Sequence, residues 1–239
     1  MKTEIALQHI SSVRAAEVER YRRYLESIAP HTDADLFRRW LFAYASVHTT
    51  WTSNCKLYRM LSDLSWIGDD VELKRRIVVS GAGFHNKRTE YISAFTTWYW
   101  DHPDWFWYSD SESWIEYRDR IRDAAPGIGR AKSSFVVEMT YPSEAQVICT
   151  DTHVMQIYGW SPKQISLGKV PERDEAQMEQ HWVAACKDGN VPPVIARWVY
   201  WDKKQNYSDP RYWSFVFEEE NYHDIFKEVA AGNNPRTDV

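Results

Sequence analysis

An aspartate between an apolar run and a Thr-His pair is the residue of this chain best placed to do chemistry. Asp151 follows Val147-Ile148-Cys149 and precedes Thr152-His153-Val154, where a short helix is expected to begin. A carboxylate at that position can simply cap the helix. In a cleft, the same carboxylate could stabilise positive charge that develops on a sugar, or could activate a water. On these residues alone both roles stay open.

A glycine turn precedes this aspartate along the chain. One expected helix ends and the next begins at Pro126-Gly127-Ile128-Gly129-Arg130. Glycine permits the dihedral angles of a tight turn, and the N–H groups of a helix N-terminus can hold a phosphate. Lys132 and Ser133 could add a charge and a hydroxyl to the same phosphate. A plain connection between helices is the alternative, because Gly-x-Gly by itself is weak evidence.

Taken together, the turn and the aspartate resemble the helix-hairpin-helix (HhH-GPD) DNA glycosylase superfamily. The pattern of that superfamily is Pro-Gly-Val/Ile-Gly-Arg, an apolar helix, and then Val-Asp-Thr-His-Val. The resemblance covers most of residues 35–202 and is strongest over 125–154. Residues 37–61, with Ala45-Ser46-Val47-His48-Thr49-Thr50, resemble the family's buried helix and the turn after it. The loop Gly81-Ala82-Gly83-Phe84-His85-Asn86-Lys87-Arg88 resembles its Gly-Phe/Tyr-x-x-Lys-Ala loop, and residues 196–201 its last core helix.

The resemblance implies roles for particular residues. Asp151 is implied as the catalytic residue, which stabilises an oxocarbenium-like sugar and positions the nucleophile. His48 stands where relatives place the residue that fills the gap left by a flipped base, although an ordinary turn histidine is an equal reading. The implied DNA-binding residues are Gly127, Ile128, Gly129, Arg130, Lys132, Ser133, His48 and Lys87, and the implied base pocket contains Thr49, Thr50, Trp51 and Asn54.

Departures from the family pattern limit the expected chemistry. Relatives that also cleave the strand carry a lysine directly after Gly-x-Gly-Arg, where this chain has Ala131. Lys132 comes one residue later, a rotation of about 100° on a helix, so Schiff-base chemistry is not expected. The family's C-terminal four-cysteine cluster is absent, and Cys55, Cys149 and Cys186 are widely spaced. We therefore predict a monofunctional enzyme with no cofactor and no metal.

The hydrophobic pattern predicts an all-α fold, a two-lobed helical bundle with a cleft between the lobes. The whole chain, 1–239, is predicted to form one such unit. Lobe one is expected over about 36–124, and lobe two over about 1–35 plus 125–230. Helices are predicted over 10–28, 36–46, 53–64, 70–79, 86–100, 111–124, 130–139, 151–158, 174–186 and 194–201, with a strand or an extended stretch over 212–217.

The bulk composition is that of an ordinary globular protein, with 44% hydrophobic and 26% charged residues. A net charge of −5 argues mildly against a nucleic-acid partner, so a local basic patch would have to contact the phosphates. We see neither a membrane-spanning segment nor the apolar core of a signal peptide, and expect no membrane partner. We expect an intracellular monomer, in the cytoplasm of a bacterium or of a phage-infected host.

Aromatic residues are the most unusual feature of the composition, with 13 Trp and 14 Tyr. They cluster at 98–100, 105–108 and 198–201, where they could form core packing or a stacking wall for a base. With the acidic balance, these inserts resemble members of the fold from bacterial viruses that hypermodify thymine.

Three functional hypotheses are therefore consistent with the sequence. The leading hypothesis is a DNA glycosylase that acts on double-stranded DNA with an extrahelical base. The alternative is a transferase that adds a small amine or amino acid to an activated 5-hydroxymethyl pyrimidine. The third is a DNA-binding module without catalysis, which the presence of Asp151 disfavours.

Overall fold

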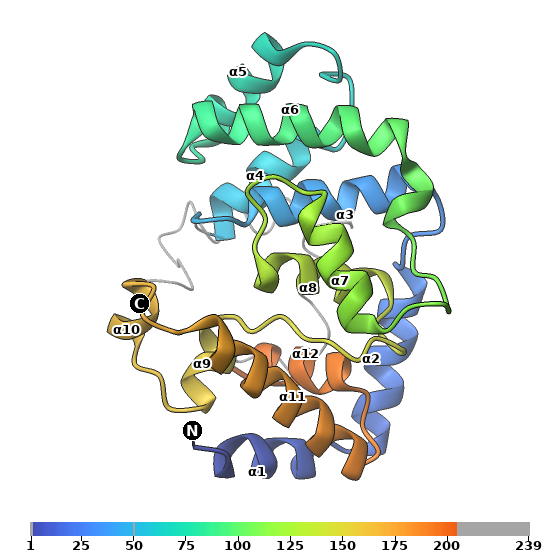
Figure 1. Ribbon diagram of the computed structural model, residues 1–239, viewed down its shortest axis with the longest axis vertical. Coiled ribbons are helices and arrows are strands. Elements are labelled where there is room, and N and C mark those ends of the chain that lie inside the picture. The colour runs from blue at the N-terminus through green and yellow to red at the C-terminus, as the bar shows by residue number, and fades with distance from the viewer. Residues whose placement is uncertain (1, 50, 205–239) are drawn as a thin grey trace. The chain divides into compact units, whose positions relative to one another are not determined.

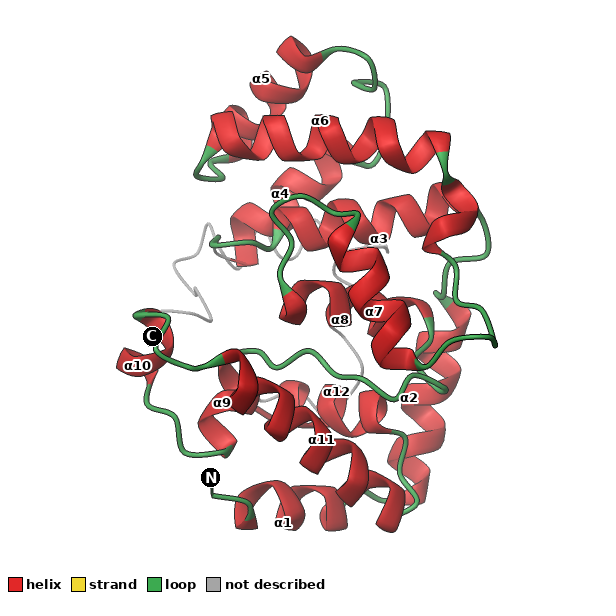
Figure 2. Ribbon diagram, viewed as in Figure 1, coloured by secondary structure: helices red, strands yellow, loops and turns green. Residues whose placement is uncertain are grey.

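The computed structural model describes residues 2–49 and 51–204, and of residues 51 and 52 the backbone alone. All regular structure in this part of the chain is helical, which confirms the predicted all-α class (Figures 1 and 2). The predicted extended stretch over 212–217 lies outside the described residues. The elements are α1 (Glu4–Ser12), α2 (Ala15–Ser27), α3 (Asp33–Ala45), α4 (Trp51–Leu61), α5 (Asp70–Ser80), α6 (His85–Asp101), η1 (Pro103–Phe106), α7 (Trp114–Asp123), α8 (Arg130–Thr140), α9 (Thr152–Ile157), α10 (Pro162–Ser166), α11 (Glu172–Asp188) and α12 (Pro193–Lys204).

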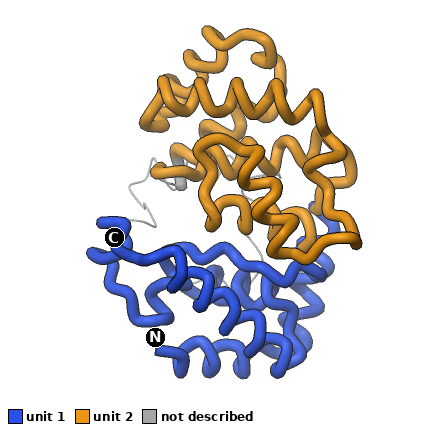
Figure 3. Tube along the Cα trace, viewed as in Figure 1, with its two compact units in different colours: residues 1–28, 142–239 blue, residues 29–141 orange. Residues whose placement is uncertain are grey.

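The chain divides into two compact units, which Figure 3 shows in different colours. Unit 1 contains residues 1–28 and 142–239, and unit 2 contains residues 29–141. The glycine turn and α8 thus belong to unit 2, whereas the sequence prediction assigned them to the second lobe. The physical reason is that α8 packs against α3 and α7, and residues 133–140 are all buried. The predicted cleft stays a prediction.

Aromatic rings fill the core of unit 2. Phe37 and Trp40 of α3 are completely buried and pack against the rings of Phe95 and Tyr99 on α6. Phe106 of η1 closes the cluster, with its ring centroid 4.7 Å from that of Tyr99. Much of the unusual aromatic content here therefore serves packing, the more ordinary of its two readings. Trp100 and Trp105 remain 39% and 45% exposed.

A buried histidine lies in the core of unit 1, where α1 packs against α11 and α12 packs against α2 and α11. His9 is 9% exposed, and its Nε2–H donates to the carbonyl oxygen of Ala196 at 2.9 Å. Its ring stacks on Trp182 and meets Tyr200 edge-on. Burial lowers the pKa of His9 below its ordinary value of 6.5.

We expect this histidine to make unit 1 less stable in acid. The unfolded chain takes up the His9 proton at a higher pH than the folded one, so stability falls as pH drops below about 6.5. His9→Gln keeps a donor for the Ala196 carbonyl but does not titrate. Urea unfolding at pH 7 and at about pH 5 should show a smaller loss of stability for His9→Gln than for the wild type. Equal losses in the two proteins would contradict the assignment.

Helix boundaries differ from the predicted ones where a short capping signal was misread. The helix predicted over 10–28 is two helices, because Val13 is extended and Arg14 begins α2 through a backbone N–H bond to the Glu17 carboxylate. The helix predicted from residue 111 begins at Trp114, because the side chain of Ser113 caps α7. The helix α10 was not predicted, although Ser161-Pro162 followed by Gln164 carries the sequence signature of a capping box. Across the described residues, no helix is both long and apolar enough to span a membrane.

Candidate functional site

Two aromatic side chains hold the glycine turn in place within unit 2. Gly127 has a φ of +76°, in the left-handed region that favours glycine. A Cβ atom at this position would lie 2.2 Å from Cδ2 of Tyr91, so the ring of Tyr91 occupies the space that a side chain would need. From α3, the hydroxyl of Tyr44 donates to the carbonyl oxygen of Pro126 at 2.9 Å. The turn is therefore bonded to α3 through Tyr44 and packed against Tyr91 of α6.

The N-terminus of α8 is open at the end of this turn. Gly129 is the N-cap residue and is exposed, and no side chain of its own caps the helix. An ideal Cβ at Gly129 would meet no atom within 4 Å. The first N–H groups of a helix lack intrahelical acceptors and carry partial positive charge. This end of α8 is thus suited to an anion such as a DNA phosphate.

Two of the predicted DNA-binding residues do not belong to this surface. Ile128 is buried and its N–H donates to the carbonyl oxygen of Ala125 at 3.1 Å, so it is a core residue of the turn. Ser133 is also buried, and its hydroxyl donates to the Arg130 carbonyl of its own helix at 2.9 Å. Arg130 is half-buried, and Lys132 places its Nζ 5.4 Å from the centre of the Phe135 ring.

A substitution at Gly129 tests the role of the open helix end. Gly129→Ala should cost the fold no more than about 1 kcal/mol, because the new methyl group meets only open space and the remaining cost is that of alanine at an N-cap. The same methyl group would stand where a phosphate approaches the α8 amides, so duplex affinity should fall by about tenfold. Fluorescence anisotropy with a labelled duplex, together with a thermal melt, measures both effects. Unchanged affinity would remove the helix end from the DNA-binding surface.

His48 and Phe84 form a second exposed feature of unit 2. The two residues have φ values of +46° and +57°, both in the left-handed region that non-glycine residues rarely adopt. Their ring centroids are 5.9 Å apart, and Phe84 is 66% exposed. An exposed pair of rings on two adjacent turns can enter a base stack or cover a gap in it. Sequence reasoning singled out His48 but gave no role to Phe84, although Phe84 stands in the loop quoted for the resemblance.

The predicted base-pocket residues lie after His48, at the start of α4. Thr49 is half-buried in the turn, and Asn54 is 4% exposed on α4. The Oδ1 atom of Asn54 has no hydrogen-bond partner among the described residues. Buried amide oxygens normally accept a hydrogen bond, so this atom is an exception among the described residues. Thr50 lies outside the described residues, and so does the side chain of Trp51.

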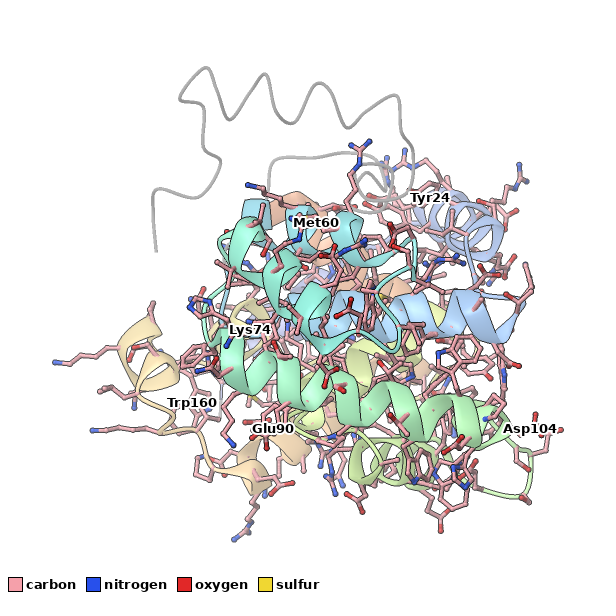
Figure 4. All side chains as sticks on the ribbon, turned by 90° about the horizontal axis from the view of Figure 1, so that it is seen from above. Tyr24, Met60, Lys74, Glu90, Asp104 and Trp160 are labelled. Carbon is pink, nitrogen blue, oxygen red and sulfur yellow. The ribbon has the colours of Figure 1, made fainter. Side chains whose placement is uncertain are left out.

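Lys87, predicted to contact phosphate, extends from the first turn of α6. Its Nζ donates to the carboxylate of Glu90 at 2.9 Å, and both side chains are exposed (Glu90 is labelled in Figure 4). The hydrogen bond to Glu90 raises the pKa of Lys87. An exposed ion pair of this kind is weak, so Lys87 can exchange this partner for a phosphate at little cost.

Asp151 caps α9 within unit 1. Its Oδ1 atom accepts hydrogen bonds from the backbone N–H groups of His153 at 2.9 Å and Val154 at 3.0 Å. Its Oδ2 atom accepts from Nη1 of Arg197 at 3.1 Å. The Asp151 side chain is 23% exposed, so the carboxylate is held in one orientation while part of it remains accessible. The geometry is that of a helix cap, which is also compatible with a role in chemistry.

Arg197 is a functional candidate that sequence reasoning missed. It lies on α12, its side chain is 4% exposed, and it forms an ion pair with Asp151. Tyr200 lies one turn later on the same helix, where burial and the nearby Asp151 charge raise its pKa. The resemblance placed α12 as the last core helix but gave no sign of this pairing. Unit 2 thus holds the glycine turn and the His48 and Phe84 rings, and unit 1 holds Asp151 and Arg197.

Known structures show the same fold as this chain. The crystal structure of the 8-oxoguanine DNA glycosylase of Methanocaldococcus jannaschii matches with a TM-score of 0.64 and 14% sequence identity, covering 84% of this chain and 94% of that one. The 8-oxoguanine glycosylase/lyase of the same organism, in complex with a 15mer DNA containing 8-oxoguanine, matches with a TM-score of 0.64 and 15% identity over 84% and 97% of the two chains. The 8-oxoguanine DNA glycosylase of Thermotoga maritima has a TM-score of 0.58 and 16% identity, over 81% and 89%.

The sequence itself matches no protein-family model and no curated protein. At these low identities the structural matches establish the fold: the chain has the helical fold of the helix-hairpin-helix DNA glycosylases. This confirms the fold that the glycine turn and Asp151 predicted. The reaction must still be argued from the residues.

Proposed function

We propose that this chain is a monofunctional DNA glycosylase, which binds duplex DNA with one nucleotide turned out and hydrolyses its N-glycosidic bond. The observation that carries the proposal is the Asp151 carboxylate, fixed by two helix amides and Arg197 and 23% exposed, in a fold shared with 8-oxoguanine DNA glycosylases. A carboxylate held in one orientation stabilises the positive charge that develops on the sugar as the base departs, without reorganising. It also positions the water that attacks the sugar.

Unit 2 supplies the contacts to DNA in this proposal. The open N-terminus of α8, with Gly127, Gly129, Arg130 and Lys132 around it, binds a backbone phosphate. The rings of His48 and Phe84 fill the space that the turned-out nucleotide leaves in the duplex. Lys87 adds a phosphate contact, and Thr49, Thr50, Trp51 and Asn54 line the base pocket in this proposal. These contacts provide the local basic patch that a chain of net charge −5 needs.

A base-excision assay tests this function. Duplexes that carry 8-oxoguanine, uracil, 5-hydroxymethyluracil, an alkylated purine or a mismatch are incubated with excess protein and then heated in alkali, which breaks the strand at an abasic site. We expect strand breaks with at least one member of the panel. The absence of breaks with every duplex, from a protein that is folded and binds DNA, would refute the proposal.

The same assay without alkali tests the absence of lyase activity. Ala131 stands at the position where strand-cleaving relatives carry a lysine, so no amine is expected to form a Schiff base with the sugar. The strand should therefore stay intact until alkali is added, and borohydride should trap no covalent complex. Lys132→Ala loses a phosphate contact but should still excise the base when the protein is in large excess over the duplex, because weaker binding does not then limit the reaction. A borohydride-trapped complex that disappears in Lys132→Ala would show a lyase instead.

Transfer of an amine or amino acid to an activated 5-hydroxymethyl pyrimidine gains no support from the comparisons, since the three structures reported above are glycosylases or glycosylase/lyases. Nucleoside mass spectrometry after incubation with activated DNA and an amine would reveal such an activity as a heavier thymidine derivative. The expectations of a monomer and of an intracellular location stay predictions.

A further inference from the structure

A buried arginine joins the two turns that carry His48 and Phe84. Arg88 lies in the first turn of α6 and is 5% exposed. Its guanidinium donates to the carbonyl oxygens of Tyr44 and Val47, the latter at 2.7 Å, and its Nε–H donates to the carbonyl oxygen of Gly83 at 3.2 Å. Tyr44 and Val47 flank the end of α3 just before His48, and Gly83 directly precedes Phe84. One side chain thus bonds to both turns.

The charge of Arg88 is not neutralised by a carboxylate of the described residues. The partners of its guanidinium there are carbonyl groups, and burial lowers its pKa. An arginine nevertheless stays protonated in proteins. A buried cation without a counter-ion carries a desolvation cost, and its field is poorly screened. It therefore adds positive potential at the surface formed by the two turns.

The backbone of these turns needs such support. His48 and Phe84 each have a positive φ, a conformation that costs energy for residues with a Cβ and persists only when surrounding contacts enforce it. Two of the three carbonyl groups that Arg88 binds, those of Val47 and Gly83, belong to the residues directly before His48 and Phe84. The contacts that enforce the two strained residues thus converge on one guanidinium.

We propose that Arg88 is a positioning residue, which holds the turns at 46–49 and 81–84 together as one rigid, positively charged edge that meets the DNA. The inference rests on the proposed function, which supplies duplex DNA as the ligand. In this inference Arg88 does not touch the DNA itself. It sets the distance between the two exposed rings and contributes part of the attraction for phosphate. Lys87, the exposed neighbour of Arg88, is paired with Glu90 and so contributes less net charge to this edge.

Three variants of the full chain test this role. Arg88→Met removes both the charge and the donors, and Arg88→Lys keeps the charge without a planar group that reaches three carbonyls. Arg120→Met is the matched control, because Arg120 also bonds to two carbonyls of unit 2, those of Trp105 and Trp107, but is paired with Glu112. Amide hydrogen exchange of residues 46–49 and 81–85, and duplex affinity by anisotropy, are measured for each.

We expect faster exchange of both turns and a loss of duplex affinity of at least about tenfold in Arg88→Met. Arg88→Lys should lie between Arg88→Met and the wild type, and Arg120→Met should resemble the wild type in both measurements. If Arg88→Met does not fold, Arg88→Lys alone decides, through the same two measurements. Affinities of the folded Arg88 variants within about twofold of the wild type would overturn the inference.

The failure of this inference differs from the failure of the proposed function. If the wild-type protein binds duplex DNA but excises no base, the proposed glycosylase activity is refuted. The duplex affinities of the Arg88 variants can still be compared in that case. If the wild-type protein excises a base and the Arg88→Met variant binds the duplex equally well, only the inference about Arg88 is refuted. A wild-type protein that binds no duplex overturns both.

Discussion

Asp151→Asn is expected to abolish base excision while leaving the fold and duplex binding nearly intact. Asparagine is as good an N-cap residue as aspartate, so the hydrogen bonds from the N–H groups of His153 and Val154 can be kept. The lost element is the negative charge that would face the developing positive charge of the sugar. The excision rate should fall by about 10²- to 10⁴-fold, measured under single-turnover conditions with excess protein.

The buried guanidinium of Arg197 complicates that variant and offers a control for it. In Asp151→Asn, the ion pair between residue 151 and Arg197 is lost, which should cost roughly 1–2 kcal/mol of stability, because the partly exposed pair is screened by solvent. The double variant Asp151→Asn, Arg197→Met should recover part of this stability without recovering any excision activity. Urea unfolding and the excision assay separate the two effects. A normal excision rate in Asp151→Asn would show that the carboxylate is only a helix cap.

Gly127→Ala is expected to destabilise unit 2 by about 2–4 kcal/mol. Two causes add: the φ of +76° is unfavourable for alanine, and the new Cβ would lie 2.2 Å from the ring of Tyr91. The collision involves Cδ2, Cε2 and Cγ of Tyr91, so the whole ring must shift to relieve it. The loss should appear as a lower urea midpoint, accompanied by weaker duplex binding because the turn that precedes α8 is displaced.

Two further variants separate the causes of this loss. Gly83→Ala places a methyl group in open space in a neighbouring loop and should change stability by less than about 1 kcal/mol. Combining Gly127→Ala with Tyr91→Ala removes the collision but not the backbone strain, so the two changes should couple favourably in a double-mutant cycle. Stability of Gly127→Ala equal to that of the wild type would mean that Tyr91 does not support the turn in this way.

The local features of the site could be predicted from the sequence. Asp151 caps α9 and Gly127 adopts a left-handed conformation, as the order of residue types around them indicated. Both features depend on hydrogen bonds and dihedral angles within a few residues, which short patterns determine. The all-helical class followed in the same way, from the periodic placement of apolar residues.

The partners of those features depended on the tertiary structure. Arg197 lies 46 residues from Asp151, and Arg88 lies 44 residues from the Tyr44 carbonyl to which it bonds. Ser133 was predicted to bind phosphate from its place at a helix start, but packing of α8 against α3 and α7 buries it. Short patterns thus determined which residues form the turn and the helix cap. Which distant side chains hold them was decided by packing, because such contacts arise only when helices remote in the chain come together.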